Sequence, residues 1–151
     1  MSNNFIRLVS TFFYIGYLPA APGTAASVAG AVLYVLLSQS LLMYLTVTSA
    51  IIALGFYVSG KMEDLTKQKD PSCIVIDEVA GILITFFMLP MTFPVVITGF
   101  FLFRAFDMFK IYPVNKFEEL GGGVGIMMDD LFAGLYANLT MQAAIRIAGI
   151  V

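Results

Sequence analysis

Two pairs of adjacent carboxylates stand inside otherwise apolar stretches of the chain. Asp77 and Glu78 begin the segment "IDEVAGILITFF", and Asp129 and Asp130 lie in the segment "GGGVGIMMDDLFAGL". Burying an ionised carboxylate in apolar surroundings is costly unless a counter-charge accompanies it. Hard divalent cations accept such oxygen ligands, so Asp77, Glu78, Asp129 and Asp130 are candidate metal ligands.

The residue types that the chain lacks narrow this chemistry. The sequence has no histidine and a single cysteine, Cys73. Histidine bases, histidine-bound zinc and thiolate clusters are therefore excluded, and Mg²⁺, Mn²⁺ or Ca²⁺ fits the carboxylates better than zinc or copper. The alternative is that single acids stabilise helix N-termini through the macrodipole. That alternative does not account for two adjacent pairs and a further acid, Asp107.

Two short glycine-containing stretches could bind phosphate through a helix N-terminus. Gly122 and Gly123 belong to a glycine run before an expected helix, whose first N–H groups are free to bind anions. In "PGT", Pro22 to Thr24, the threonine could either cap a helix or offer its hydroxyl to a phosphate.

A group of charges lies at the end of another apolar segment, "FRAFDMFK". Arg104 and Asp107 are three residues apart on one expected helix face, and Lys110 follows one turn later. This spacing is typical of an intrahelical ion pair, so a structural role and a role at a phosphate site both remain open.

Composition indicates that these charges sit in a membrane protein. Of 151 residues, 60% are hydrophobic and 12% are charged, about half the charged fraction of ordinary globular domains. A spanning helix needs about 20 residues, and the uncharged stretch 8–60 is long enough for two. We expect one all-α polytopic domain over residues 1–151, with a short interfacial or re-entrant helix over 5–18. About five transmembrane helices are predicted, near 24–40, 41–59, 72–89, 94–110 and 124–147.

Alternation of these spans places the charged residues on one side of the membrane. The third and fifth spans begin on the side where the fourth span ends, so their acids meet one leaflet. Loop lysines such as Lys61, Lys67, Lys69 and Lys116 accumulate on that side. The positive-inside rule therefore predicts that this side is cytoplasmic.

Four blocks of the sequence together resemble one known family. "PAAPGTAAS", "VIDEVAGILITFFMLP", "FRAFDMFKIYPVNKFE" and "GGGVGIMMDDLFAGL" are similar, in order and spacing, to the bacterial phosphatidylglycerophosphatase A family. The resemblance implies a Mg²⁺-dependent phosphatase of the bacterial inner membrane. Its substrate would be phosphatidylglycerol phosphate in the cytoplasmic leaflet, and its products phosphatidylglycerol and inorganic phosphate. We expect no nucleic-acid partner and no obligate protein partner.

The resemblance also implies roles for the residues named above. The family's acidic motifs fall on Asp77 and Glu78, on Asp107, and on Asp129 and Asp130, with one or two Mg²⁺ ions held by the two pairs. Catalytic roles would fall to Asp107, Asp129 and Asp130, with Asp107 acting as a general base or orienting Arg104, and attack by an aspartate stays open. Phosphate binding would fall to Thr24, Arg104, Lys110, Gly122 and Gly123. Some members carry a histidine where this chain has Leu120, and we expect that position to be dispensable.

Two alternatives to this phosphatase belong to different classes. Clustered intramembrane acids also occur in small ion-coupled carriers and channels, although their sites tend to lie near the membrane midplane. A phosphatidyl-transferring enzyme with aspartate-bound Mg²⁺ is the other alternative, but its Asp-Gly-x-x-Ala-Arg pattern is absent from the sequence.

Overall fold

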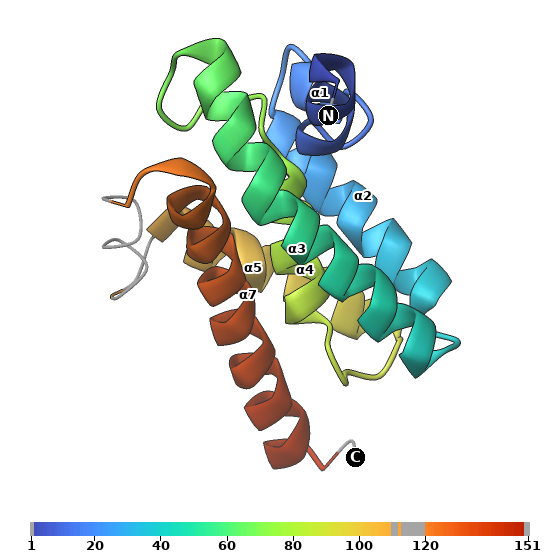
Figure 1. The fold of residues 1–151 in the computed structure, drawn as a ribbon. Helices are drawn as coiled ribbons and strands as arrows, with labels where there is room; N and C mark the ends of the chain where they lie inside the picture. Colours follow the sequence, from blue (N-terminus) through green and yellow to red (C-terminus); the bar gives the residue numbers. More distant parts are fainter. Residues whose placement is uncertain (1, 110–111, 113–119, 150–151) are drawn as a thin grey trace.

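The computed structural model describes residues 2–109, 112 and 120–149, and in these ranges the chain is helical without strands (Figure 1). The all-α prediction is therefore confirmed for the part of the chain that the structure describes. These ranges contain six α-helices and a short 3-10 helix, joined by loops: α1 (Asn3–Ser10), η1 (Ile15–Tyr17), α2 (Pro22–Leu37), α3 (Leu41–Thr66), α4 (Ile76–Thr85), α5 (Phe93–Phe109) and α7 (Gly122–Ile147).

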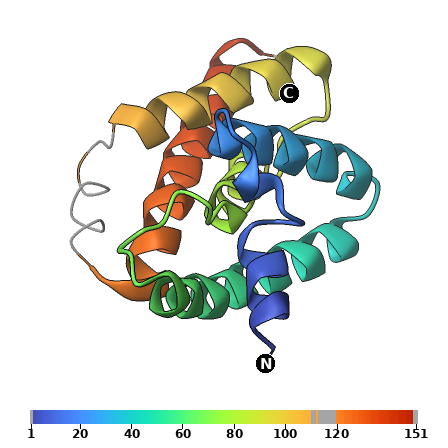
Figure 2. The same cartoon turned by 90° about the horizontal axis from the view of Figure 1, so that it is seen from above.

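Helix α4 forms the centre of the molecule. It contacts α2, α3, α5 and α7, which enclose it in the view of Figure 2. Apolar side chains such as Val79, Ile82 and Leu83 are completely buried on it, whereas the surrounding helices each expose one apolar face. Beyond Asp77 and Glu78 in its first turn, α4 carries no charged residue, and a helix with apolar side chains on nearly all faces is stable only inside such a shell.

Helix α4 is also short, and the sequence prediction of a spanning helix over 72–89 is wrong in its extent. The helix ends at Thr85, and ten residues reach only about 15 Å at 1.5 Å per residue. The carbonyl groups freed by this early end are bonded by buried side chains. Asn138 Nδ2 donates to the carbonyl oxygens of Thr85 (2.9 Å) and Phe87 (2.8 Å).

Two buried tyrosines bond further carbonyls of the same segment. The hydroxyl of Tyr44 donates to the Leu83 carbonyl, and the hydroxyl of Tyr34 donates to the Leu89 carbonyl at 3.0 Å. Non-helical backbone at membrane depth is tolerated only where such partners satisfy its polar groups. Four carbonyls at the end of α4 and in the segment after it thus have side-chain partners within the protein.

Glycines set the distance between the central helices. An added Cβ at Gly134 on α7 would collide with the Gly81 carbonyl on α4. Near the start of α7, an added Cβ at Gly123 would collide with the Phe56 carbonyl of α3. Small residues at both contacts allow backbones to approach closely, as is typical of helices packed in membranes.

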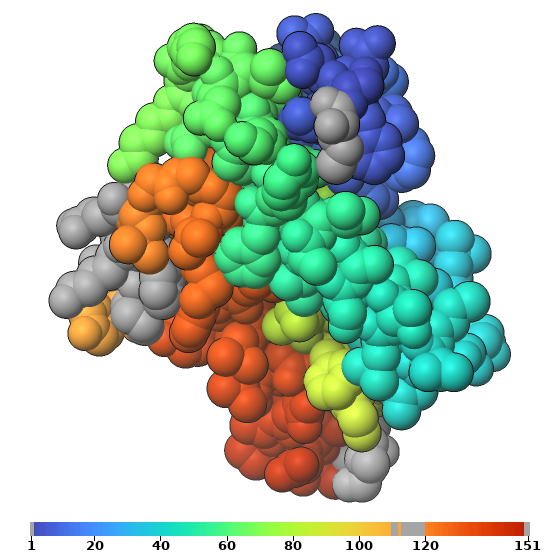
Figure 3. Space-filling view, viewed as in Figure 1, coloured from blue at the N-terminus to red at the C-terminus, as the bar shows by residue number. Residues whose placement is uncertain are grey.

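One described helix, α3, is long and apolar enough to cross a bilayer by length and composition, while α2 is apolar but shorter. Five spanning helices are therefore not confirmed. Large hydrophobic side chains are exposed along several helices, and the face in Figure 3 is covered largely by α3 and α7. Exposed examples on these two helices are Leu42, Leu45 and Leu54 of α3 and Leu139 of α7.

The N-terminal segment does not form the single helix predicted over 5–18. Ser2 caps α1 by accepting a hydrogen bond from the Asn4 N–H, and the helix ends at Ser10. Phe12, Phe13 and Tyr14 then have positive φ angles, a conformation that non-glycine residues rarely adopt and that turns the chain sharply. The outcome is a short helix followed by a turn with exposed aromatic side chains.

Candidate active site

A polar cavity of about 390 Å³ lies where five segments meet. The start of α2, the end of α3 with its following loop, the start of α4, the end of α5 and the start of α7 all contribute to it. The lining includes Thr24, Glu63, Lys69, Asp70, Asp77, Glu78, Arg104, Asp107, Gly125, Asp129 and Asp130. The prediction that the charged residues converge at one end of the helices is thus confirmed in the geometry.

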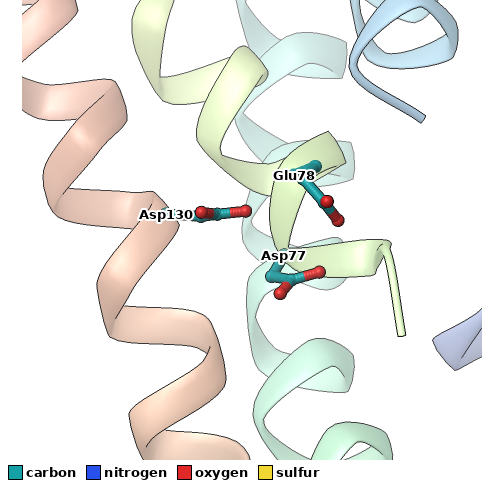
Figure 4. A group of neighbouring side chains, drawn as sticks. All are labelled: Asp77, Glu78 and Asp130. Atoms are coloured by element: carbon teal, nitrogen blue, oxygen red, sulfur yellow. The ribbon is translucent and has the colours of Figure 1, made fainter. Parts of the chain in front are cut away.

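Three carboxylates form the centre of this cavity. One oxygen from each of Asp77, Glu78 and Asp130 lies within 4.8 Å of the others. Figure 4 shows Asp77 and Glu78 leaving the first turn of α4 and Asp130 pointing toward them from α7. Asp77 is 9% and Asp130 4% exposed, so water screens their mutual repulsion poorly.

Two oxygens of these carboxylates lack a hydrogen-bond partner among the described residues. Asp77 Oδ1 and Glu78 Oε2 are buried and, within the described ranges, have no hydrogen-bond partner. Buried carboxylate oxygens normally have hydrogen-bond or ion partners, because an unsatisfied one loses its hydration without replacement. These oxygens therefore offer ligand positions for a hard cation.

Arg104 and Asp107 form an ion pair at the wall of the cavity. Arg104 Nη1 lies 2.6 Å from Asp107 Oδ2, and both side chains are about one-fifth exposed. The intrahelical pair predicted from their spacing is therefore confirmed, and it lies at the site. A guanidinium held by one carboxylate still has other N–H groups that can bind an anion.

The start of α2 is pressed against the acidic centre. An added Cβ at Gly23 would overlap Glu78 Oε1 and lie 3.8 Å from Arg104 Nη1. No side chain caps this helix N-terminus. Pro22 has no N–H, so the N–H groups without an intrahelical acceptor belong to Gly23 and Thr24, two residues that line the cavity. A side chain at position 23 would displace the Glu78 carboxylate, so glycine lets the α2 backbone lie this close to it.

Some of the remaining predicted residues line the cavity and others do not. Asp129 lines the cavity but is not part of the three-carboxylate group, and Thr24 lines the cavity at the start of α2. Gly123 packs against α3, and Gly122, with φ +72°, does not line the cavity, whereas Gly125 does. Lys110 lies outside the described residues.

Sequence reasoning missed four polar residues that line the cavity. They belong to the end of α3 and the loop after it: Glu63, Lys69, Asp70 and Ser72. Glu63 Oε1 accepts a hydrogen bond from the Asp70 N–H at 3.0 Å. The polar stretch "GKMEDLTKQKDP" was used only to orient the chain in the membrane. Its acids, one helical turn beyond an apolar span, were the available signal.

Comparisons with known proteins assign this arrangement to a family. The family described as phosphatidylglycerophosphatase A matches residues 8–145. A protein from Haemophilus influenzae named "Phosphatidylglycerophosphatase A" is 35% identical over 93% of this chain and 88% of its own length. One from Escherichia coli with the same name is 34% identical over 89% of this chain and 80% of its own length.

A third relative carries a different name. It comes from Bacteroides thetaiotaomicron, is named "Putative phosphatidylinositol-3-phosphatase", and is 37% identical over 94% of both chains. No solved structure matches the chain. The family match covers most of the chain and includes every segment that lines the cavity. This chain belongs to the phosphatidylglycerophosphatase A family, whose members are phosphoric monoester hydrolases.

Proposed function

We propose that this protein is a Mg²⁺-dependent lipid phosphatase that removes the terminal phosphate of phosphatidylglycerol phosphate. The observation that carries the proposal is the convergence of Asp77, Glu78 and Asp130 beside Arg104 in one cavity. The family and two relatives named for this activity support the same reaction.

The donor atoms support a hard divalent cation as the cofactor. All three central ligands are carboxylates, and one buried oxygen each of Asp77 and Glu78 has no hydrogen-bond partner among the described residues. Mg²⁺ prefers one or two carboxylates together with phosphate oxygens and water. When bound, Mg²⁺ would supply Lewis-acid polarisation of the phosphate and lower the pKa of water. Asp129 is proposed as a further ligand from its place in the same cavity.

Arg104 and the start of α2 are proposed to bind the phosphate. The guanidinium, fixed by Asp107, can stabilise charge that develops on phosphoryl oxygens. The free N–H groups at the start of α2, next to Gly23, add a second set of donors on the same side. Thr24 extends this set with its hydroxyl, and Asp107 either orients Arg104 or accepts a proton.

The surrounding helices are proposed to place this cavity at a membrane surface. In this arrangement α2, α3, α5 and α7 each cross the bilayer, and α4 together with residues 86–92 forms a fifth passage. The side-chain partners of the carbonyls after α4 make such a broken passage possible in a bilayer. Lysines near the cavity end, including Lys61 and Lys69, favour a cytoplasmic location for the site in the bacterial inner membrane.

A second head group has support from one relative. The Bacteroides protein is named for action on a phosphatidylinositol 3-phosphate, whose phosphomonoester on a lipid presents the same chemistry to the cavity. We rank phosphatidylglycerol phosphate first because the family and two relatives agree on it.

Phosphate release by the purified protein in detergent tests the proposal. Phosphatidylglycerol phosphate should release phosphate when Mg²⁺ is present and not when a chelator removes it, and phosphatidylinositol 3-phosphate should react more slowly. Faster phosphate release from phosphatidylinositol 3-phosphate would make that lipid the preferred substrate. No Mg²⁺-dependent release from either lipid would contradict a phosphatase and favour the carrier or channel alternative.

A further inference from the structure

An apolar groove of about 300 Å³ runs along the outside of the molecule between α2 and α5. Its walls are aliphatic and aromatic: Val28, Val32 and Val35 on α2 and Ile97, Phe100 and Phe101 on α5. Figure 2 shows the two helices side by side, and they contact each other. The groove is open, since Val32 is 56% and Phe101 65% exposed.

The groove begins where the polar cavity ends. On α2, the valines follow Thr24 at spacings of three and four residues, so they share its helix face. On α5, Phe101 and Phe100 precede Arg104 by three and four residues and share its face in the same way. Thr24 and Arg104 both line the cavity. The same two helices therefore form the wall of the cavity and, directly beyond it, the walls of the groove.

The depth that α2 covers from the cavity to the far end of the groove matches one leaflet. From Thr24 at the cavity to Val35, α2 extends roughly 16 Å at 1.5 Å per residue, of which the groove wall from Val28 to Val35 covers about 10 Å. The hydrocarbon core of a bilayer is about 30 Å thick, so one acyl chain in one leaflet occupies about half of that depth. The opposite face of α2 packs through Gly30 against Val79 and Ile82 of α4, which leaves the valine face for an outside partner.

We propose that this groove holds one acyl chain of the lipid whose phosphate lies in the cavity. This inference rests on the proposed lipid phosphatase function and adds the part of the substrate that the polar cavity does not bind. The groove suits an acyl chain, because such a chain needs a continuous apolar surface that starts beside the head-group site. The groove then contributes to KM for long-chain lipids and not to the chemical step.

A kinetic test uses a variant in which a larger side chain fills the groove. Val32→Trp should raise KM about tenfold for dipalmitoyl phosphatidylglycerol phosphate in detergent, and should leave kcat/KM for the dibutyryl analogue unchanged, because its chains are too short to reach position 32. Leu45→Trp adds similar bulk to an exposed site on α3 and should change neither value. Equal effects of Val32→Trp on both lipids, or no effect on the long-chain lipid, would overturn the proposal.

A binding test does not depend on turnover. The chain has no tryptophan, so one substitution introduces a single fluorescent reporter. Phe101→Trp places it in the groove, and Phe93→Trp places it at the start of α5, outside the groove. Phosphatidylglycerol phosphate with brominated acyl chains should quench Trp fluorescence in the Phe101→Trp protein at a lower mole fraction than brominated phosphatidylcholine does. The Phe93→Trp protein should respond equally to both lipids.

Equal quenching of the Phe101→Trp protein by the two lipids would mean that the groove binds bulk lipid only, which overturns the proposal. Absence of phosphate release by the wild-type protein would instead contradict the proposed function. The quenching comparison still decides whether a phosphomonoester lipid occupies the groove, so the two failures are distinguishable.

Discussion

Gly134 on α7 lies directly against the Gly81 carbonyl on α4, with no space for a Cβ between them. Asp130 precedes Gly134 by four residues, and Asp77 precedes Gly81 by the same number. Both acids therefore lie one helical turn from the crossing point, on the same side of it. The close helix crossing is what brings carboxylates from distant parts of the chain within ligand distance of each other.

Gly134→Ala should separate the two helices. The added methyl group has no space, and overpacking of this kind costs about 1–3 kcal/mol of stability. Thermal unfolding in detergent should show a lower midpoint, and the Mg²⁺ concentration needed for phosphate release should rise. Gly121→Ala is the matched control, because no atom lies within 4 Å of its added Cβ. Similar behaviour of the two variants would contradict the close crossing.

Asn138→Ala should destabilise the end of α4. The change removes hydrogen bonds to the buried carbonyl of Thr85 and the partly buried carbonyl of Phe87, and the buried acceptor left unsatisfied costs about 1–3 kcal/mol. The thermal midpoint is again the measurement. Thr140→Ala removes an exposed hydroxyl that bonds only its own helix and should change the midpoint little. Equal midpoints for the two variants would show that Asn138 does not stabilise the break after α4.

Asp107 should act on catalysis through Arg104. We expect Arg104→Gln to lower kcat/KM about 100-fold, since it removes a donor to the phosphoryl oxygens. Asp107→Asn should cost about tenfold in the wild-type background and little in the Arg104→Gln background, because its partner is already gone. Measuring kcat/KM for the wild type, the two single variants and the double variant gives the coupling free energy between Asp107 and Arg104. Independent, multiplying effects would mean that Asp107 has a separate role, such as that of a general base.

The membrane orientation is testable with single cysteines in a Cys73→Ser background. Burial raises the pKa of the Cys73 thiol, which keeps it protonated and slow to react, and the serine removes it entirely. Gln68→Cys, in the loop beside the cavity, should resist a membrane-impermeant thiol reagent in intact cells whose outer membrane has been made permeable. Thr92→Cys, at the opposite end of the helices, should react. The reverse labelling pattern would place the cavity on the outer side.

Much of the site could be predicted from the sequence because its charges are rare and lie at segment ends. Alternating the direction of successive apolar segments is sufficient to bring Asp77, Arg104 and Asp130 to one end, as the cavity confirms. In the sequence, Gly81 follows Asp77 by four residues and Gly134 follows Asp130 by four, and this shared spacing reflects the helix crossing.

The parts that were missed depend on tertiary contacts. The end of α4 at Thr85 follows from partners such as Tyr44 and Asn138, which are distant in sequence and have no local signal. Gly123 looked like a phosphate-binding glycine, but its position is explained by packing against Phe56. A glycine before a helix has the same sequence pattern in both cases, and only the neighbouring helix distinguishes them.

Asp77, Glu78 and Asp130 are proposed to form one divalent-cation site. The most direct measurement is the thermal unfolding midpoint of the purified protein with Mg²⁺ and with chelator. A ligand that binds only the folded state at about 100 times its Kd stabilises it by about 2.7 kcal/mol, so Mg²⁺ should raise the wild-type midpoint. Asp77→Asn and Asp130→Asn should each lose most of this rise.

The same variants should be at least as stable as the wild type in chelator, because each removes one charge from a crowded carboxylate group. Asp64→Asn, a change at an exposed acid paired with Lys61, should keep the full response to Mg²⁺. That combination, a Mg²⁺ response lost at positions 77 and 130 and retained at position 64, is the predicted result. A wild-type midpoint that ignores Mg²⁺, or equal responses in all four proteins, would contradict the shared site.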